Sequence, residues 1–238
     1  MNTFLEGKNA IVTGGTRGIG FAIARALAEA GAGVAISGRS PENVENSVRK
    51  LTGVSKSKVV GKVADVRDST QVSRFFEFVE MELGGIDILV NNAGVGVFKS
   101  TAEMSIAEWQ TTLDTNLSGV FYCCHEALPR FKNRGGGYII NIGSLAGKNA
   151  FAGGAAYNAS KFGLKGFSEA MMLDHRHENV RVSCVMPGSV DTEFGGSARR
   201  SDWKIAPEDI AEIVLMLLKT PVRTLVSRVE VRPSKPLK

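Results

Sequence analysis

Short runs of apolar and β-branched residues alternate along the chain with longer stretches in which apolar residues recur at three- and four-residue spacing. All but the last of these runs are apolar nearly throughout, as expected of strands that helices cover on both faces. This alternation is typical of a parallel sheet wrapped by helices in an α/β fold. The expected strands span residues 10–13, 34–37, 59–63, 86–90, 138–142, 180–186 and 225–231. The expected helices span residues 18–31, 41–51, 69–83, 105–132, 156–178 and 207–219.

The last run, residues 225–231, alternates apolar and polar residues, which predicts a strand at the edge of the sheet with one face toward solvent or a partner. No linker, charge block or internal repeat marks a domain boundary, and α/β folds reach 238 residues around one core. We therefore expect a single domain over residues 1–238. Residues 191–204 show no helical or strand period, so we expect a substrate lid within residues 189–206, with a plain surface loop as the alternative.

The composition excludes several classes of protein. It is 43% hydrophobic and 22% charged, which is typical of a globular protein rather than a disordered one. The net charge of +5 is dispersed rather than clustered, which argues against nucleic-acid binding. No apolar run approaches the ~20 residues of a membrane span, and the N-terminus lacks a secretory pattern, so we expect a cytoplasmic protein without a membrane partner. The cysteines Cys123, Cys124 and Cys184 lack metal-ligand spacing, so we expect reduced thiols and no metal.

A glycine-rich segment between the first expected strand and the first expected helix is the most specific local signal. Residues 13–20 read Thr-Gly-Gly-Thr-Arg-Gly-Ile-Gly. Glycines there let the backbone approach a pyrophosphate, and the helix N-terminus offers unpaired N–H groups to its negative charge. Glycines also serve turns, but the position in the first βαβ unit favours a dinucleotide site. The expected cofactor-binding residues of this segment are Gly14, Thr16, Arg17, Gly18, Ile19 and Gly20.

Two arginines indicate which nicotinamide cofactor binds. About 20 residues past the glycine segment, an NAD site carries an acidic residue that accepts hydrogen bonds from the ribose 2′-hydroxyl. Here the second strand is followed by Arg39, which suits a 2′-phosphate, and Arg17 offers a second positive charge. Either arginine alone is equally compatible with a solvated surface cation. Together they favour NADP(H) over NAD(H).

A tyrosine, a lysine and a serine form the candidate catalytic group. Tyr157 and Lys161 lie four residues apart at the start of an expected helix, so they share one face. A free tyrosine has a pKa of about 10, and a nearby positive charge is expected to lower the pKa of Tyr157 toward a useful range. Ser144 follows the fifth expected strand, at the sheet edge where open α/β sheets bind ligands.

These motifs together resemble the short-chain dehydrogenase/reductase family. The segment 13–20 matches the family's Thr-Gly-x-x-x-Gly-x-Gly, and Ser144, Tyr157 and Lys161 match its catalytic serine, tyrosine and lysine. The resemblance extends from Lys8 to about Val231. It implies a Rossmann-type doubly wound parallel sheet of about seven strands flanked by helices on both faces.

Further motifs of the family occur in the same order along the chain. Asn91-Asn92-Ala93-Gly94 resembles the segment that supports the adenosine side of the cofactor, and Asp65-Val66 resembles the pair that contacts adenine. Asn116 matches an asparagine whose distorted backbone holds a water in the proton relay. Pro187-Gly188 with Val190 and Thr192 resembles the segment that contacts the nicotinamide carboxamide. By this resemblance, the further cofactor-binding residues are Asp65, Val66, Asn92, Ala93, Gly94, Tyr157, Lys161, Pro187, Gly188, Val190 and Thr192.

The resemblance implies hydride transfer between a nicotinamide and a small-molecule carbonyl or alcohol substrate, with Tyr157 as general acid/base, Ser144 stabilising the carbonyl oxygen and Asn116 in the proton relay. Among family members the chain is most similar to 3-oxoacyl-[acyl-carrier-protein] reductase-like members, which implies a 3-oxoacyl thioester as one expected substrate. Arg199 and Arg200 in the expected lid suit an acidic carrier protein, but the same charges would suit any anionic substrate. Sugar, steroid, quinone or aldehyde substrates stay open, as does a dinucleotide-binding sensor without catalysis. A homodimer or homotetramer is expected, although the short basic tail after Val231 departs from relatives that close a tetramer there.

Overall fold

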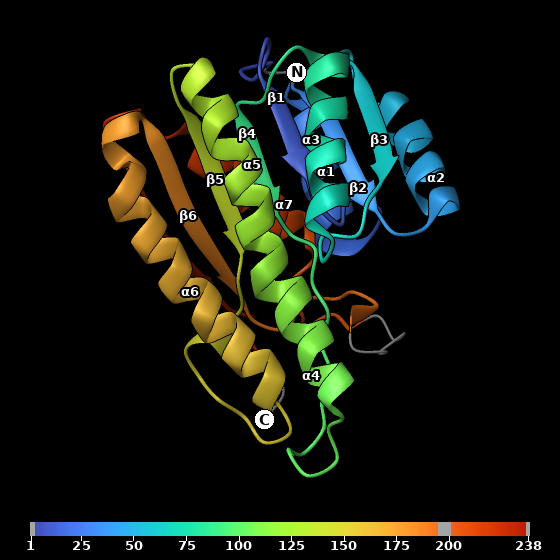
Figure 1. Cartoon of the computed structure of the whole chain (residues 1–238), viewed down its shortest axis with the longest axis vertical. Coiled ribbons are helices and arrows are strands. Elements are labelled where there is room, and N and C mark those ends of the chain that lie inside the picture. The colour runs from blue at the N-terminus through green and yellow to red at the C-terminus, as the bar shows by residue number, and fades with distance from the viewer. Residues whose placement is uncertain (1–2, 195–200, 237–238) are drawn as a thin grey trace.

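The computed structural model describes residues 3–194 and 201–236. Within these residues, a single parallel sheet has the strand order β3-β2-β1-β4-β5-β6-β7, with helices on both faces (Figure 1). The predicted Rossmann-type fold is therefore confirmed. The strands are β1 (Asn9–Val12), β2 (Gly33–Gly38), β3 (Val59–Val63), β4 (Ile88–Asn91), β5 (Gly137–Ile142), β6 (Val180–Pro187) and β7 (Arg228–Val231).

Two hydrophobic clusters, one on each face, hold the helices against the sheet. The helices are α1 (Gly18–Glu29), α2 (Pro41–Thr52), α3 (Ser69–Leu83), α4 (Ile106–Leu113), α5 (Gly119–Asn133), α6 (Ala155–His175) and α7 (Pro207–Lys219). Side chains of α1 and α7 pack with alternate residues of the strands on one face, and those of α3, α5 and α6 pack on the other. Figure 1 shows α3, α5 and α6 across the near face.

Local signals in the sequence fix several helix starts. Ser40 accepts a hydrogen bond from the Asn43 N–H before α2, which also has a proline in its first turn. Asp68 accepts from two backbone N–H groups at the start of α3. Ser105 and Glu108 form a reciprocal capping box at the start of α4. These caps satisfy N–H groups that the helices leave unpaired, so α2, α3 and α4 begin close to where the pattern predicts.

The strand order reverses direction beside β1, which has β2 on one side and β4 on the other. From β1 the chain continues outward to β2 and β3, and then crosses to β4 on the opposite side. The helices that follow β1 and β4 therefore diverge, which opens a crevice at the carboxyl ends of these strands. The glycine-rich segment follows β1 and lies at this crevice.

The long helix predicted over residues 105–132 is interrupted, which corrects that expectation. A π-helical turn at Asp114–Ser118 separates α4 from α5, and the Gly119 N–H bonds to the Asp114 carbonyl. Asn116 within this turn bonds to the neighbouring loop rather than facing solvent. Gly119 lets the helix approach the loop that follows β3, since a Cβ atom there would lie 2.8 Å from the Val66 carbonyl oxygen. Such turns are rare and often occur at functional sites.

The ends of the chain's last elements differ modestly from the predictions. β7 begins at Arg228, three residues later than expected, and lies at the sheet edge as predicted. The final predicted turn of α6 is a 3₁₀ turn at Arg176–Glu178, which ends at Asn179 in the left-handed conformation. Among the described residues, no helix is both long and apolar enough to cross a membrane. The three cysteines are free and buried.

Candidate active site

The glycine-rich segment forms a cradle that side chains would fill. Gly14 has a φ of +62°, and a Cβ atom there would lie 2.9 Å from the Cα of Ala93. Asn92 supports the turn because its side-chain N–H groups donate to the carbonyls of Thr13 (3.0 Å) and Gly14 (3.1 Å). Arg17, at the N-cap of α1, makes no side-chain cap, so the first N–H groups of α1 are left for an anion. The cradle fits the pyrophosphate of a dinucleotide.

Both predicted arginines lie at the cleft beside the glycine-rich segment. Arg39 is exposed and borders the cleft beside the end of β2. Arg17 is also exposed, and its guanidinium lies 3.2 Å from the carboxylate of Glu193 in the segment after β6. An exposed pair of this kind contributes little to stability. Because both arginine side chains are exposed, both guanidiniums are accessible to a phosphate.

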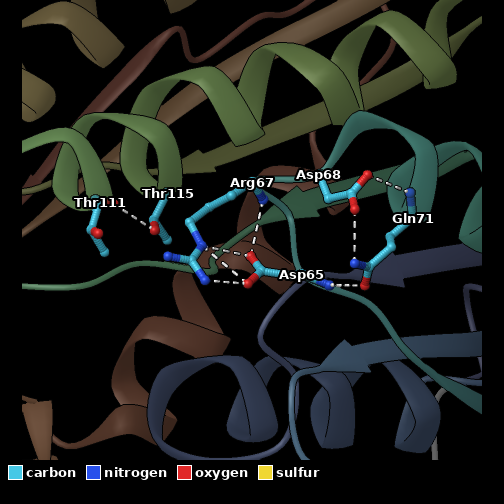
Figure 2. Close-up of polar contacts among 6 residues, drawn as sticks. All are labelled: Asp65, Arg67, Asp68, Gln71, Thr111 and Thr115. Atoms are coloured by element: carbon cyan, nitrogen blue, oxygen red, sulfur yellow. Dashed lines mark hydrogen bonds and ion pairs between the residues drawn. The ribbon is translucent and has the colours of Figure 1, made fainter. Parts of the chain in front are cut away.

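Asp65 is held by an arginine that the sequence did not single out (Figure 2). The guanidinium of Arg67 binds both carboxylate oxygens of Asp65, with its Nη2 atom 2.6 Å from Oδ2. This pairing holds the pKa of Asp65 below its ordinary value, and Arg39 adds to the effect. The Asp65 N–H donates to Gln71, whose side-chain amide donates to Asp68 at 2.9 Å. Asp65 is thus a fixed, charge-compensated group in the lining of the cleft.

Ser144, Tyr157 and Lys161 come together where β5 meets α6. Ser144 follows β5, and the other two lie on the first turns of α6. Lys161 is 6% exposed, and its ammonium donates to the Ile142 carbonyl at 2.9 Å. Burial lowers the pKa of Lys161 to about 8. Its Nζ atom lies 5.8 Å from the centre of the Tyr157 ring.

The pKa of Tyr157 corrects the expectation drawn from its neighbour. Burial raises the pKa of Tyr157 above its ordinary value, and the hydrogen bond with Ser144 lowers it only in part. The ammonium of Lys161 is directed at the Ile142 carbonyl, so its charge does not dominate at the phenol. In the chain by itself, the tyrosine is therefore in its protonated, acid form at neutral pH.

Asn116 lies behind the cleft rather than on its wall. It is fully buried, and its amide bonds to both the N–H (2.8 Å) and the carbonyl (2.9 Å) of Val95. It also donates to the Ser160 hydroxyl at 3.0 Å, which donates in turn to the Tyr157 carbonyl. Asn116 thus ties the loop after β4 to the helix that carries Tyr157. Its role in a water-mediated relay stays a prediction.

One cleft of about 1150 Å³ brings the remaining predicted residues together. Apart from Asn116, all the predicted catalytic and cofactor-binding residues line it: Gly14, Thr16, Arg17, Gly18, Ile19, Gly20, Arg39, Asp65, Val66, Asn92, Ala93, Gly94, Ser144, Tyr157, Lys161, Pro187, Gly188, Val190 and Thr192. The base of the predicted lid is held by two backbone hydrogen bonds, in which the Asp191 N–H donates to the Ile205 carbonyl at 2.8 Å and the Ile205 N–H donates to the Ser189 carbonyl at 3.0 Å. Its segment 195–200, with Arg199 and Arg200, lies outside the described residues.

The cleft also contains residues that the sequence did not indicate. They are the aromatic side chains Phe98 and Phe151 and the C-terminal residues Arg232, Pro233 and Pro236. The aromatic side chains of Phe194 and Trp203, which belong to the predicted lid, also line the cleft. Each aromatic residue stands alone in a loop, without a motif or period. The tail residues follow β7 at the sheet edge, where nothing in their composition suggests a place beside the cleft. Only the folding of separate loops around Tyr157 identifies them.

The strand order, the cradle and the Ser144, Tyr157 and Lys161 group define a dinucleotide-binding α/β protein with a candidate proton donor. Residues 8–203 match the family model described as short chain dehydrogenase. The chain belongs to this family of nicotinamide-dependent oxidoreductases.

Individual relatives agree with this assignment. A 3-oxoacyl-[acyl-carrier-protein] reductase of Chlamydia muridarum is 40% identical over 195 residues, 82% of this chain and 78% of its own length. An uncharacterised oxidoreductase of Staphylococcus saprophyticus is 32% identical over 96% of this chain and 98% of its own.

Two solved structures share the fold over almost the whole chain. An alcohol dehydrogenase from the archaeon Thermococcus sibiricus, complexed with 5-hydroxy-NADP, superposes with a TM-score of 0.90 at 31% identity, covering 97% of this chain and 99% of its own. A metagenomic short-chain oxidoreductase in complex with NADP superposes with a TM-score of 0.86 at 37% identity, covering 98% of this chain and 99% of its own.

Proposed function

We propose that this protein is an NADP(H)-dependent oxidoreductase that interconverts a carbonyl compound and its alcohol, with Tyr157 as the general acid/base. The observation that carries the proposal is the meeting of Tyr157, Ser144 and Lys161 with the glycine cradle in one cleft. The cradle suits a pyrophosphate, and the three side chains suit a carbonyl placed beside a nicotinamide.

When bound and reduced, the nicotinamide supplies a hydride, which a carbonyl carbon accepts as its π electrons move to oxygen. Tyr157 donates its hydroxyl proton to that oxygen, so hydride and proton together give the alcohol. Ser144 donates a hydrogen bond to the same oxygen and stabilises its developing charge. The raised pKa of Tyr157 keeps the proton on the phenol, which suits reduction at neutral pH.

Lys161 and Asn116 have supporting roles in this proposal. The buried ammonium of Lys161 lies near Tyr157 and would hold the hydroxyls of the nicotinamide ribose. Asn116 fixes the first turn of α6 through Ser160, and a water beside it would return a proton to Tyr157 through Lys161.

Preference for NADP(H) over NAD(H) is supported by charge at the adenosine end. Arg17 and Arg39 are exposed beside the cradle, and Arg67 compensates the carboxylate of Asp65, which would otherwise repel a 2′-phosphate. Both structural neighbours described above hold an NADP compound.

The substrate is a small carbonyl compound or alcohol, and the Chlamydia relative makes a 3-oxoacyl thioester one candidate. Assembly into a homodimer or homotetramer and a cytoplasmic location stay predictions from the sequence.

Oxidation of NADPH and of NADH with a panel of ketones and aldehydes tests the proposal. We expect turnover with several members of the panel and a higher kcat/KM with NADPH. Equal values for the two cofactors would remove the NADP(H) preference. Tight NADPH binding without oxidation by any carbonyl would favour the dinucleotide-binding sensor instead.

A further inference from the structure

Three phenylalanine side chains are exposed around the hydroxyl-bearing ring of Tyr157. Phe98 is 45% exposed, Phe151 is 47% exposed and Phe194 is 43% exposed, and all three line the cleft. They come from three different loops, which follow β4, β5 and β6. Large apolar side chains gathered at one concave place indicate a binding surface, because isolated exposed residues would be scattered.

The rings meet at the angles that favourable aromatic contacts require. The centre of the Phe98 ring lies 5.5 Å from the centre of the Tyr157 ring, with the ring planes inclined at 75°. Phe194 lies 5.8 Å from Tyr157 and 6.5 Å from Phe98, at 52° and 68°. Phe151 lies 5.8 Å from Phe98. Inclined and edge-to-face arrangements of this kind are the ones that aromatic pairs favour.

Backbone contacts and a glycine position the loops that carry these rings. A parallel bridge joins Lys99 to Gly154, next to the loops that carry Phe98 and Phe151. Gly96 admits two of the rings, since a Cβ atom there would lie 2.8 Å from both the Phe98 and the Phe194 ring. A side chain at position 96 would therefore push the two rings apart.

We propose that this aromatic surface selects carbonyl substrates in which an aromatic ring is attached to the reacting carbon. The inference rests on the proposed function, since it names the substrate class for the same site. The carbonyl would lie at Tyr157 and Ser144, and the substrate ring would lie against Phe98, with Phe151 and Phe194 beside it.

The surface suits an aromatic group better than an extended thioester arm. A flat ring gains edge-to-face and offset contacts beyond the burial of its area. The amide groups of a carrier-linked arm would lose water against the rings without gaining hydrogen bonds from them. Phe98 contacts all three other rings, so it contributes most to the selection.

The test compares acetophenone with cyclohexyl methyl ketone, which has the same carbon skeleton and a saturated ring, and with an acetoacetyl thioester of N-acetylcysteamine. Each is reduced with NADPH by the wild-type protein and by Phe98→Leu, which keeps an apolar side chain but removes the ring. Phe162→Leu is the matched control, because Phe162 is 40% exposed on the helix that carries Tyr157 and does not line the cleft. Binding of acetophenone in the presence of NADP⁺, where no hydride is available, is measured by calorimetry.

We expect Phe98→Leu to lower kcat/KM for acetophenone by about 3- to 10-fold, to weaken its binding by a similar factor, and to change the saturated ketone by less than about twofold. Phe162→Leu should leave all values unchanged. Equal losses for all three substrates, or a wild-type preference for the thioester, would overturn the aromatic selection and leave the proposed function standing. Turnover of none of the substrates would instead contradict the proposed function.

Discussion

Replacing Lys161 with methionine should change how the stability of this chain depends on pH. The ammonium is 6% exposed and faces the Ile142 carbonyl at 2.9 Å. Burial lowers its pKa from 10.5 to about 8, which corresponds to about 3 kcal/mol against the charged form. Methionine keeps the apolar stem of the side chain and removes the charge.

The sign follows from where the proton is bound. Between about pH 8 and 10.5, the lysine holds a proton in the unfolded chain but has lost it in the folded one. The free energy of unfolding therefore rises with pH in this window. Relative to Lys161→Met, the wild-type protein should gain about 3 kcal/mol between pH 7 and pH 10.5.

Urea unfolding of the cofactor-free proteins, followed by circular dichroism at several pH values, measures this difference. Tyr157 and Cys184 are titratable groups close to Lys161, and burial raises the pKa of both, so the comparison is repeated with Tyr157→Phe and with Cys184→Ala in both proteins. A difference that stays flat within about 1 kcal/mol across the window would refute the reasoning that Lys161 is desolvated as the structure has it.

The structure predicts the effects of three further substitutions. Arg39→Asp should lower kcat/KM with NADPH by about 10- to 100-fold and change kcat/KM with NADH by much less, as measured by steady-state kinetics. Equal losses with the two cofactors would contradict the assignment of Arg39 to the 2′-phosphate. Gly20→Ala brings a Cβ atom against the Gly14 carbonyl and the Asn92 amide, so NADPH affinity should fall at least about tenfold in a fluorescence titration, while an unchanged affinity would disprove the close fit. Asp87→Asn removes the partner of Lys8 and Arg134 and should lower the free energy of unfolding by about 2 kcal/mol at pH 7 in a denaturant titration. Burial raises the pKa of Asp87, but hydrogen bonds from the Asn9 N–H, Arg134 and Lys8 outweigh burial and hold the pKa below 3.8. The stability loss of the variant should therefore disappear as the pH falls below that value. A loss independent of pH would contradict this pairing.

The fold and the cradle could be predicted because their signals are local. An apolar strand, a glycine turn and an alanine-rich helix follow one another within the first βαβ unit, so their order in the sequence indicates the cradle. Tyr157 and Lys161 were predicted to share a face because helix spacing alone determines it. Ser144 was placed near them because the carboxyl ends of parallel strands meet at one edge.

Other features depend on contacts between segments that are distant in the sequence. The π-helical turn at Asn116 adds one residue to a helix whose apolar pattern continues on both sides, so the pattern does not reveal it. The pKa of Tyr157 depends on burial and on where the Lys161 ammonium donates its hydrogen bond, and spacing determines neither. The rings of Phe98 and Phe194 meet only when two loops fold over one helix.

The charge compensation at Asp65 has a different origin. Arg67 is two residues away, and a surface turn with an acid and a base at this spacing is common. Its importance comes from the position of Asp65 in the lining of the cleft, where a family motif predicts contact with adenine.

Tyr157 is the group proposed to exchange a proton with the substrate, and Tyr157→Phe tests this role most directly. Turnover with NADPH and a ketone should fall by about 10²- to 10⁴-fold, the usual contribution of a positioned acid or base. The dissociation constant for NADPH, measured on the same preparation, should change by less than about threefold, since the phenyl ring keeps the packing around Phe98 and Phe194. A variant that binds NADPH normally and keeps about a tenth or more of wild-type turnover would contradict the account.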